Sequence, residues 1–206
     1  MYYPFPEIKT IDDVLPHVEG LDEFIVAERE FGTVINYQIS TNTTFDMSGI
    51  DDHAGSIRRE CRGLIFDTDG KIISRPFHKF FNVNEREETQ IGAIDITKPH
   101  IIMEKMDGSM IRPLVFDGRI LLGTKMGLSD VAKQAQEIIS SAQLKVLCEL
   151  ALDGKTPLLE FISPENQIVI SYDDAELVLL AIRDTVTGEY YDPELYSEMT
   201  RGMFRV

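Results

Sequence analysis

The sequence has few cysteines, no long apolar run and no leader-like start. Only two cysteines occur in 206 residues, Cys61 and Cys148, and their wide separation excludes a cysteine cluster of the metal-binding type. No apolar run approaches the roughly 20 residues of a membrane-spanning helix, and the N-terminal residues "MYYPFPEIKT" lack the basic and apolar regions of a signal peptide. We therefore expect free thiols, a reducing cytoplasmic setting and no membrane association.

Positive charge is also scarce. The chain has 20 Lys and Arg against 35 Asp and Glu, a formal net charge of -15, which argues against broad, non-specific nucleic-acid binding. Two stretches are nevertheless basic: residues 56–86 hold seven Lys and Arg against four Asp and Glu, and residues 98–125 hold five against three. An anion-binding site is expected in these stretches, although chance variation in charge explains the counts equally well.

Turn signals and apolar patterns predict an α+β fold with largely antiparallel sheets. Asp-Gly pairs between apolar runs, at residues 69–70 and 117–118, are typical of tight hairpins, and the one long helical pattern lies between sets of strands. The predicted strands cover residues 23–28, 33–40, 63–66, 71–77, 111–116, 119–125, 157–162, 167–172 and 176–184. The predicted helices cover residues 10–19, 129–152 and 193–199, and residues 41–56 are predicted to form a loop.

The stretch "EKMDGSM" places a lysine, Lys105, two residues before an Asp107-Gly108 turn. The preceding apolar run predicts a strand over residues 99–105 that would deliver Lys105, partly buried, at the edge of a sheet. A free lysine has a pKa of about 10.4, so attack on a phosphate needs nearby cations, desolvation or a divalent metal to favour the neutral amine. A solvated surface lysine is the alternative, because a Lys-x-Asp-Gly turn alone is a weak motif.

Phosphoryl transfer depends mainly on positioning and on neutralising phosphate charge. The two basic stretches offer Arg62, Lys79 and Lys125 for this role. Glu160 is a lone acid within an apolar strand and is a candidate to bind a ribose hydroxyl, since such an acid usually has a partner or a function. The alternatives are that the cations are ordinary surface charges and that Glu160 faces solvent.

Taken together, several segments resemble the adenylylating domain of bacteriophage tRNA-repair RNA ligases, within the lysine nucleotidyltransferase superfamily of polynucleotide ligases and mRNA capping enzymes. "EKMDGSM" resembles the nucleophile motif of that family. Residues 60–85 resemble the block upstream of it, residues 158–172 the block that reaches the ribose, and residues 177–191 the strand pair that follows. The resemblance is good over residues 56–206 and loose before them. It implies the nucleotidyltransferase, ATP-grasp-like fold in a single domain over residues 1–206.

The resemblance also implies a role for each candidate residue. Lys105 would form the covalent adduct with AMP, and Asp107 would position Lys105 or a metal ion. ATP and Mg²⁺ or Mn²⁺ are the implied cofactors, and the metal ligands stay unassigned. The nucleotide would be bound by the backbone at Glu104 near the adenine, by Arg62 at the phosphates, by Lys79 and Phe80 in the pocket wall, by Lys125 and, at the ribose, by Glu160.

The implied activity is ATP-dependent RNA ligation. AMP would pass from the lysine to an RNA 5′-phosphate, and a 3′-hydroxyl would then attack; a tRNA is one candidate substrate, and the cytoplasm of a phage-infected cell is the expected location. The chain departs from the family in lacking its Glu-Gly and Lys-x-Lys strands. It is therefore read as a domain incomplete at its C-terminal side, with a fragment, one half of a split ligase, and a non-catalytic nucleotide- or RNA-binding module left open. A DNA ligase or capping enzyme is less favoured, because residues 60–85 resemble the RNA-repair group.

Overall fold

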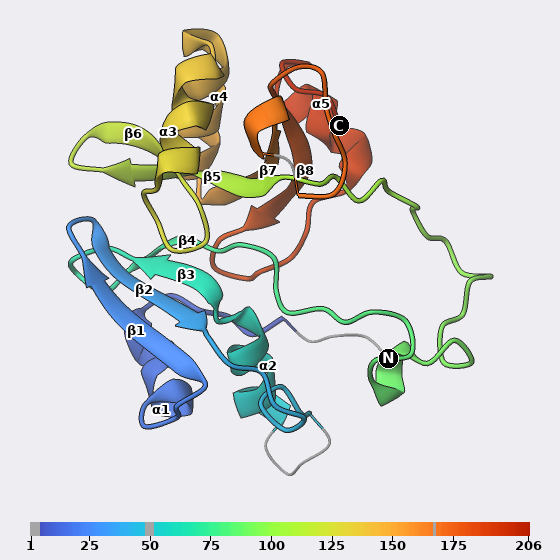
Figure 1. The fold of residues 1–206 in the computed structure, drawn as a ribbon. Helices are drawn as coiled ribbons and strands as arrows, with labels where there is room; N and C mark the ends of the chain where they lie inside the picture. Colours follow the sequence, from blue (N-terminus) through green and yellow to red (C-terminus); the bar gives the residue numbers. More distant parts are fainter. Residues whose placement is uncertain (1–4, 48–51, 167) are drawn as a thin grey trace.

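The strands of the computed structural model form two four-stranded sheets, which lie one above the other as layers (Figure 1). The structure describes residues 5–47, 52–166 and 168–206. Every pairing between these strands is antiparallel, so the predicted α+β class is confirmed. Each sheet comes from one continuous stretch of chain, the first from residues 24–74 and the second from residues 109–184.

The first sheet has the order β1-β2-β3-β4. Its two predicted hairpins are confirmed. At the start of β2, Gly32 has a φ of +124°, and a Cβ atom there would lie 2.0 Å from the carbonyl oxygen of Phe66, so only glycine fits. Alternate side chains pack on opposite faces, Ile35 toward α1 and α2 and Val34 toward the second sheet. The strands are β1 (Phe24–Arg29), β2 (Gly32–Tyr37), β3 (Arg62–Phe66) and β4 (Ile72–Ser74).

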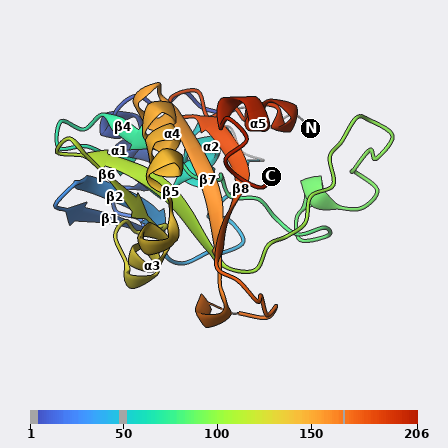
Figure 2. The same cartoon turned by 90° about the horizontal axis from the view of Figure 1, so that it is seen from above.

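The second sheet has the order β6-β5-β7-β8. The predicted β5–β6 hairpin is confirmed: Asp117 and Gly118 have φ values of 49° and 66°, the left-handed pair that suits a two-residue turn. Helix α4 lies across β5 and β7 (Figure 2), and together with α3 it buries the outer face of the sheet. The strands are β5 (Ser109–Phe116), β6 (Arg119–Gly123), β7 (Lys155–Ile162) and β8 (Glu176–Asp184).

The helices differ from the predictions in two places. Residues 41–56 were predicted to form a loop, but α2 (Asp52–Glu60) begins inside that range. The helix forms because Ile57 is buried in the core under the first sheet. Residues 48–51 of the predicted loop lie outside the described part of the chain. The predicted helix over residues 129–152 is two helices, α3 (Asp130–Ile138) and α4 (Ser141–Leu152). The helix breaks because Ser140 caps α4 through the backbone N–H of Gln143.

The short helices predicted near the two ends of the chain are confirmed, whereas the 3₁₀ turns Glu87–Thr89 and Pro164–Asn166 were not predicted. Thr10 opens a 3₁₀ turn (Ile11–Asp13), where its N–H donates to Asp13 Oδ2 at 2.8 Å, and α1 (Leu15–Val18) follows. Near the end of the chain, α5 (Tyr196–Met199) follows the 3₁₀ turn Pro193–Leu195. In the described part of the chain, no helix combines the length and the apolar character that crossing a membrane requires.

Two predicted strands are wrong. Residues 99–105 belong to a long connection between β4 and β5 that projects away from both sheets (Figure 1), and Ile102 is 88% exposed. Residues 168–172 lie in the β7–β8 connection, where Val169 is 76% exposed; Gln167, the first residue of that predicted strand, lies outside the described part. An apolar run becomes a strand only when a neighbouring strand accepts its backbone hydrogen bonds, and neither run has such a neighbour among the described residues.

Candidate active site

Lys105 lies at the inner end of the projecting connection, directly before the chain enters β5. Its side chain is exposed, so the expected strand and partial burial at this position are wrong. The next two residues, Met106 and Asp107, are buried, with exposures of 7% and 8%. Lys105 is therefore the last residue of the exposed part of the connection, and the buried turn begins directly after it. Its side chain is accessible from solvent.

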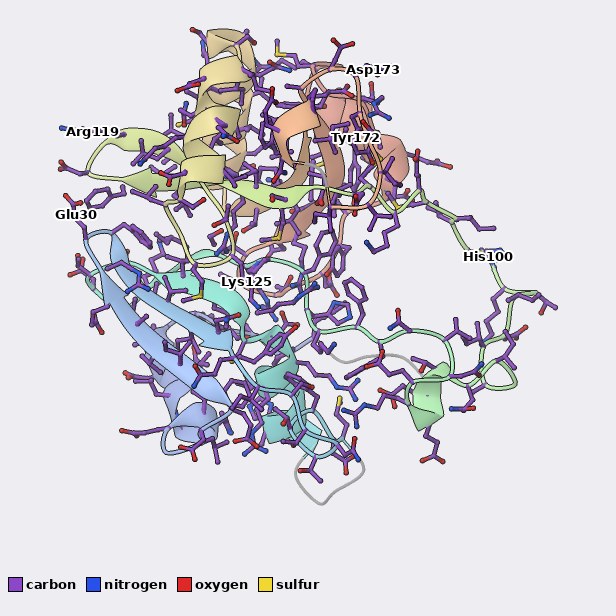
Figure 3. All side chains as sticks on the ribbon, viewed as in Figure 1. Glu30, His100, Arg119, Lys125, Tyr172 and Asp173 are labelled. Carbon is purple, nitrogen blue, oxygen red and sulfur yellow. The ribbon has the colours of Figure 1, made fainter. Side chains whose placement is uncertain are left out.

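Asp107 fixes the turn that follows the lysine. Its Oδ2 atom accepts hydrogen bonds from the backbone N–H groups of Val169 and Ile170 at 2.5 and 2.7 Å, and its own N–H donates to the hydroxyl of Tyr172 at 3.0 Å. The two bonds from Ile170 and Val169 lower the pKa of Asp107, so its carboxylate stays ionised. The labelled Tyr172 lies at the second sheet, away from the tip of the projecting connection (Figure 3). Asp107 thus ties the lysine turn to the β7–β8 connection.

Glu160 lies on β7 beside the same turn. Its Oε1 atom accepts the N–H of Gly108 at 3.0 Å. A Cβ atom on Gly108 would lie 2.2 Å from the carbonyl oxygen of Phe161, so the turn packs on β7 at a distance that only glycine allows. Burial raises the pKa of Glu160 to about 7, and the Gly108 bond and the charges of Lys105 and Arg62 partly oppose this. The structure therefore brings both Lys105 and Arg62 into electrostatic range of Glu160.

Three predicted cations gather where the two sheets face each other. The Nζ atoms of Lys125 and Lys79 lie 4.3 and 5.9 Å from the centre of the Tyr37 ring. Burial, and then the charges of Arg62 and Lys79, lower the pKa of Lys125. Within the described residues, no carboxylate forms an ion pair with any of the three cations. Lys125 lies between the two sheets (Figure 3), and Arg62 connects the cluster electrostatically to Glu160.

Aromatic rings hold these cations in place. The guanidinium of Arg62 lies 4.8 Å from the centre of the Phe80 ring, and the Phe80 side chain is 54% exposed. Phe81 is the more central ring: Lys79 and Arg86 both lie 4.7 Å from its centre. Cation–π contacts of this kind favour a charged side chain that has no carboxylate partner.

Three contributors were not identified from the sequence. Tyr37 lies within the predicted strand over residues 33–40, Phe81 is adjacent to the predicted Phe80, and Tyr172 lies in the wrongly predicted strand. The sequence "KFFN" indicated that phenylalanines lie at the site, but only the structure shows which cation each ring contacts.

Glu104, the predicted backbone contact of the adenine, is exposed. Its carboxylate contributes to raising the pKa of Arg205, so it lies within electrostatic range of the C-terminal segment.

The site holds no ready-made set of metal ligands. Among the residues that the structure describes, no three His, Cys, Asp or Glu side chains form a group that could hold an ion. The nearby carboxylates, Asp107 and Glu160, already accept backbone N–H groups. A divalent ion would fit here as Mg²⁺ usually does at phosphates, held mainly by phosphate oxygens and water.

The two facing antiparallel sheets form the nucleotidyltransferase fold, which a solved ligase structure shares. A solved structure of an Aquifex aeolicus protein assigned as an ATP-dependent DNA ligase superimposes with a TM-score of 0.56 at 12% identity, covering 92% of this chain and 47% of that one. At this identity the likeness concerns the fold alone.

Sequence comparisons identify the family. The RNA ligase family model matches residues 60–202, so the chain belongs to the RNA ligase family. A protein of Thermovibrio ammonificans assigned as an RNA ligase is 34% identical over 201 residues, which cover 96% of this chain and 50% of that protein. RNA ligase 1 of bacteriophage TS2126 is 28% identical over 206 residues, which cover 94% of this chain and 50% of that protein. The chain spans about half the length of these relatives.

Proposed function

We propose that this chain carries the nucleotidyl-transfer centre of an ATP-dependent RNA ligase. The observation that carries the proposal is a cluster of three cations, Arg62, Lys79 and Lys125, which have no ion-pair partner among the described residues. One of them, Arg62, lies within electrostatic range of Glu160, which is also within range of Lys105. In a chain with a net charge of -15, three clustered cations repel one another. A bound triphosphate would remove that repulsion.

In the proposed reaction the Nζ atom of Lys105, after losing a proton to water, attacks the α-phosphorus of ATP. A phosphorus–nitrogen bond forms and pyrophosphate leaves. Arg62, Lys79 and Lys125 neutralise phosphate charge, and Glu160 accepts a hydrogen bond from a ribose hydroxyl. Bound Mg²⁺ or Mn²⁺ would neutralise further charge on the phosphate oxygens.

The later steps concern RNA. AMP would pass from Lys105 to an RNA 5′-phosphate, and a 3′-hydroxyl would then attack that phosphate and release AMP. We propose a single domain over residues 1–206, with residues 1–55 contributing N-terminal strands and a helix and residues 56–206 forming the nucleotide-binding core. The proposed setting is RNA repair, with tRNA as a candidate substrate, in the cytoplasm of a phage-infected cell. The additional length of the relatives would supply further catalytic strands and RNA specificity.

Intact-mass spectrometry tests the proposal. The purified chain is incubated with ATP and Mg²⁺ or Mn²⁺ beside two variants, Lys105→Ala and Lys98→Ala, the second removing an exposed lysine from the same projecting connection. We expect the wild type and Lys98→Ala to gain the mass of one AMP and Lys105→Ala to gain none, because Lys105 lies within electrostatic range of Glu160 in the proposed site.

Titration with ATP separates the remaining outcomes. The exposed position of Lys105 also suits a second function, nucleotide binding without transfer. ATP binding without an adduct would support that function and contradict catalysis by this chain. A folded chain that shows neither adduct nor binding would contradict both.

A further inference from the structure

Arg112 is a cation buried between the two sheets, below the proposed nucleotide site. It lies on β5, two residues after Met110, which pairs with Glu160 on β7. Residues two apart on a strand share a face, and the next residue on this face, Leu114, packs against Val34 of the first sheet. Arg112 therefore points from the second sheet into the first, and its side chain has no exposed surface.

The guanidinium of Arg112 bonds to three acceptors. Its Nη1 donates to the Oγ of Ser74 at 3.0 Å, and its Nη2 donates to the carbonyl oxygens of Gly63 at 2.5 Å and Lys125 at 3.3 Å. Ser74 and Gly63 belong to the first sheet, and Lys125 follows β6 of the second. One side chain thus links the two sheets. Its Nε atom has no acceptor among the described residues.

The charge of Arg112 is not compensated within the described part of the chain. Burial alone lowers the pKa of Arg112 to about 9, and no carboxylate opposes that shift. The other two fully buried arginines, Arg75 and Arg183, both bond to the buried carboxylate of Glu60. A buried charge without a counter-ion is costly, so the position of Arg112 needs a reason other than stability.

The acceptors of Arg112 supply that reason. Gly63 directly follows Arg62 in the chain, and the other carbonyl acceptor belongs to Lys125. Arg62 and Lys125 are both candidates for binding the phosphates. The two backbones touch: a Cβ atom on Gly63, whose φ is +104°, would lie 2.4 Å from the Lys125 carbonyl oxygen. Arg112 bonds to both carbonyls at this contact, so it sets the separation between the backbones from which the Arg62 and Lys125 side chains extend.

We infer that Arg112 is a positioning residue for the phosphates of the nucleotide. It holds Arg62 and Lys125 at a fixed separation and adds a positive charge beneath them, without touching the nucleotide. The inference rests on the proposed nucleotide site. Because Arg112 would act on the phosphates alone, its substitution should weaken binding of ATP. Binding of adenosine, which has no phosphates, should stay unchanged.

Binding of ATP and of adenosine to the full chain, measured by ligand-observed NMR at one ionic strength, tests the inference. In Arg112→Met we expect ATP affinity to fall by about ten-fold or more, as for other residues that orient a site from outside it, with adenosine affinity unchanged. Arg112→Lys keeps the charge but not the planar fork and is expected to recover part of the loss. The matched control is Arg119→Met, which removes a charge from the exposed far end of the same hairpin (Figure 3) and is expected to bind both ligands normally.

Four outcomes are decisive. Unchanged ATP affinity in Arg112→Met would overturn the inference, as would equal losses for ATP and adenosine, which indicate a merely structural role. If Arg112→Met shows no cooperative melting transition, Arg112→Lys and Ser74→Ala take its place: a selective loss of ATP affinity supports the inference, and no loss overturns it. A folded wild type that does not bind ATP contradicts the proposed function itself, and with it this role of Arg112.

Discussion

At the residue scale, Glu160 links the proposed site to the pH dependence of stability. Its pKa is raised from an ordinary 4.5 to about 7, mainly by burial. With this raised pKa, the folded state binds the proton of Glu160 more tightly than the unfolded state does. The protonated carboxyl therefore stabilises the fold below pH 4.5, and this stabilisation is lost as the pH rises through 7. Glu160→Gln keeps an oxygen for the Gly108 N–H but carries no charge. We therefore expect its Tm to exceed that of the wild type at pH 8 and to match it at pH 4.5.

Thermal melts of both proteins at the two pH values check this prediction, with Glu165→Gln as the control. Glu165 is an exposed glutamate in the adjoining connection, and its substitution is expected to leave the pH dependence unchanged. A constant difference in Tm between wild type and Glu160→Gln at the two pH values would contradict the raised pKa.

The residue types of the site could be predicted from the sequence, but their environments could not. Lys105, Asp107 and Gly108 lie close together in the sequence, so the Asp-Gly pair predicted a turn after Lys105, although this short motif alone does not identify a site. The acceptor role of Asp107 depends on backbone N–H groups 62 and 63 positions further on, and no local pattern encodes such a contact. The burial of Arg112 was hidden for the same reason, since its acceptors lie in the other sheet.

At the element scale, the carboxylate of Asp107 anchors the middle of the β7–β8 connection. Asp107 accepts the N–H groups of Val169 and Ile170, whose side chains are 76% and 44% exposed and add little packing. Hydrogen bonds to a charged acceptor contribute about 1.5–3 kcal/mol each. In Asp107→Ala we therefore expect amide exchange at Val169 and Ile170 to become at least about ten-fold faster.

Hydrogen–deuterium exchange read by NMR gives the rates for the two amides directly. Asp95→Ala is the control, because the carboxylate of Asp95 bonds only locally, to Thr97. Equal exchange rates at Val169 and Ile170 in the wild type and Asp107→Ala would show that some other contact holds the connection.

Elements with local signals were the ones predicted from the sequence. The Asp117-Gly118 turn needs no distant partner, and both its residues have the positive φ that this turn requires. The apolar residues Ile102 and Val169 resemble strand residues, yet they are exposed because no strand lies beside them. Helix α2 shows the reverse case: its sequence is polar, and the burial of Ile57 against the first sheet stabilises it.

At the scale of the whole molecule, one buried ion cluster joins distant parts of the chain. Glu60, at the end of α2, bonds to Arg75 after β4 and to Arg183 on β8, each at 3.0 Å, and all three side chains are fully buried. Arg75 also donates to the carbonyl oxygens of Pro6 and Val186 at 2.9 and 2.7 Å. Removing the only anion of such a cluster leaves buried cations uncompensated. We expect Glu60→Gln to lower the free energy of unfolding by about 3–5 kcal/mol.

Urea denaturation measures this loss, with Glu176→Gln for comparison. Glu176 pairs with Arg205 at 2.7 Å in a largely exposed ion pair, which is expected to contribute at most about 1 kcal/mol. Similar small losses in both variants would mean that the buried cluster does not join the two sheets as its geometry indicates.

Because each sheet comes from one continuous stretch of chain, the order of folding follows from the topology. Hairpins between neighbouring strands close short loops and form early, whereas contacts between the sheets close longer loops. Each sheet can therefore take shape before the two dock. The cation cluster and the Arg112 bonds exist only after docking, because their members come from both sheets. A nascent chain would thus acquire its affinity for phosphate at the last step of folding, and ATP would stabilise the docked state over its separated halves.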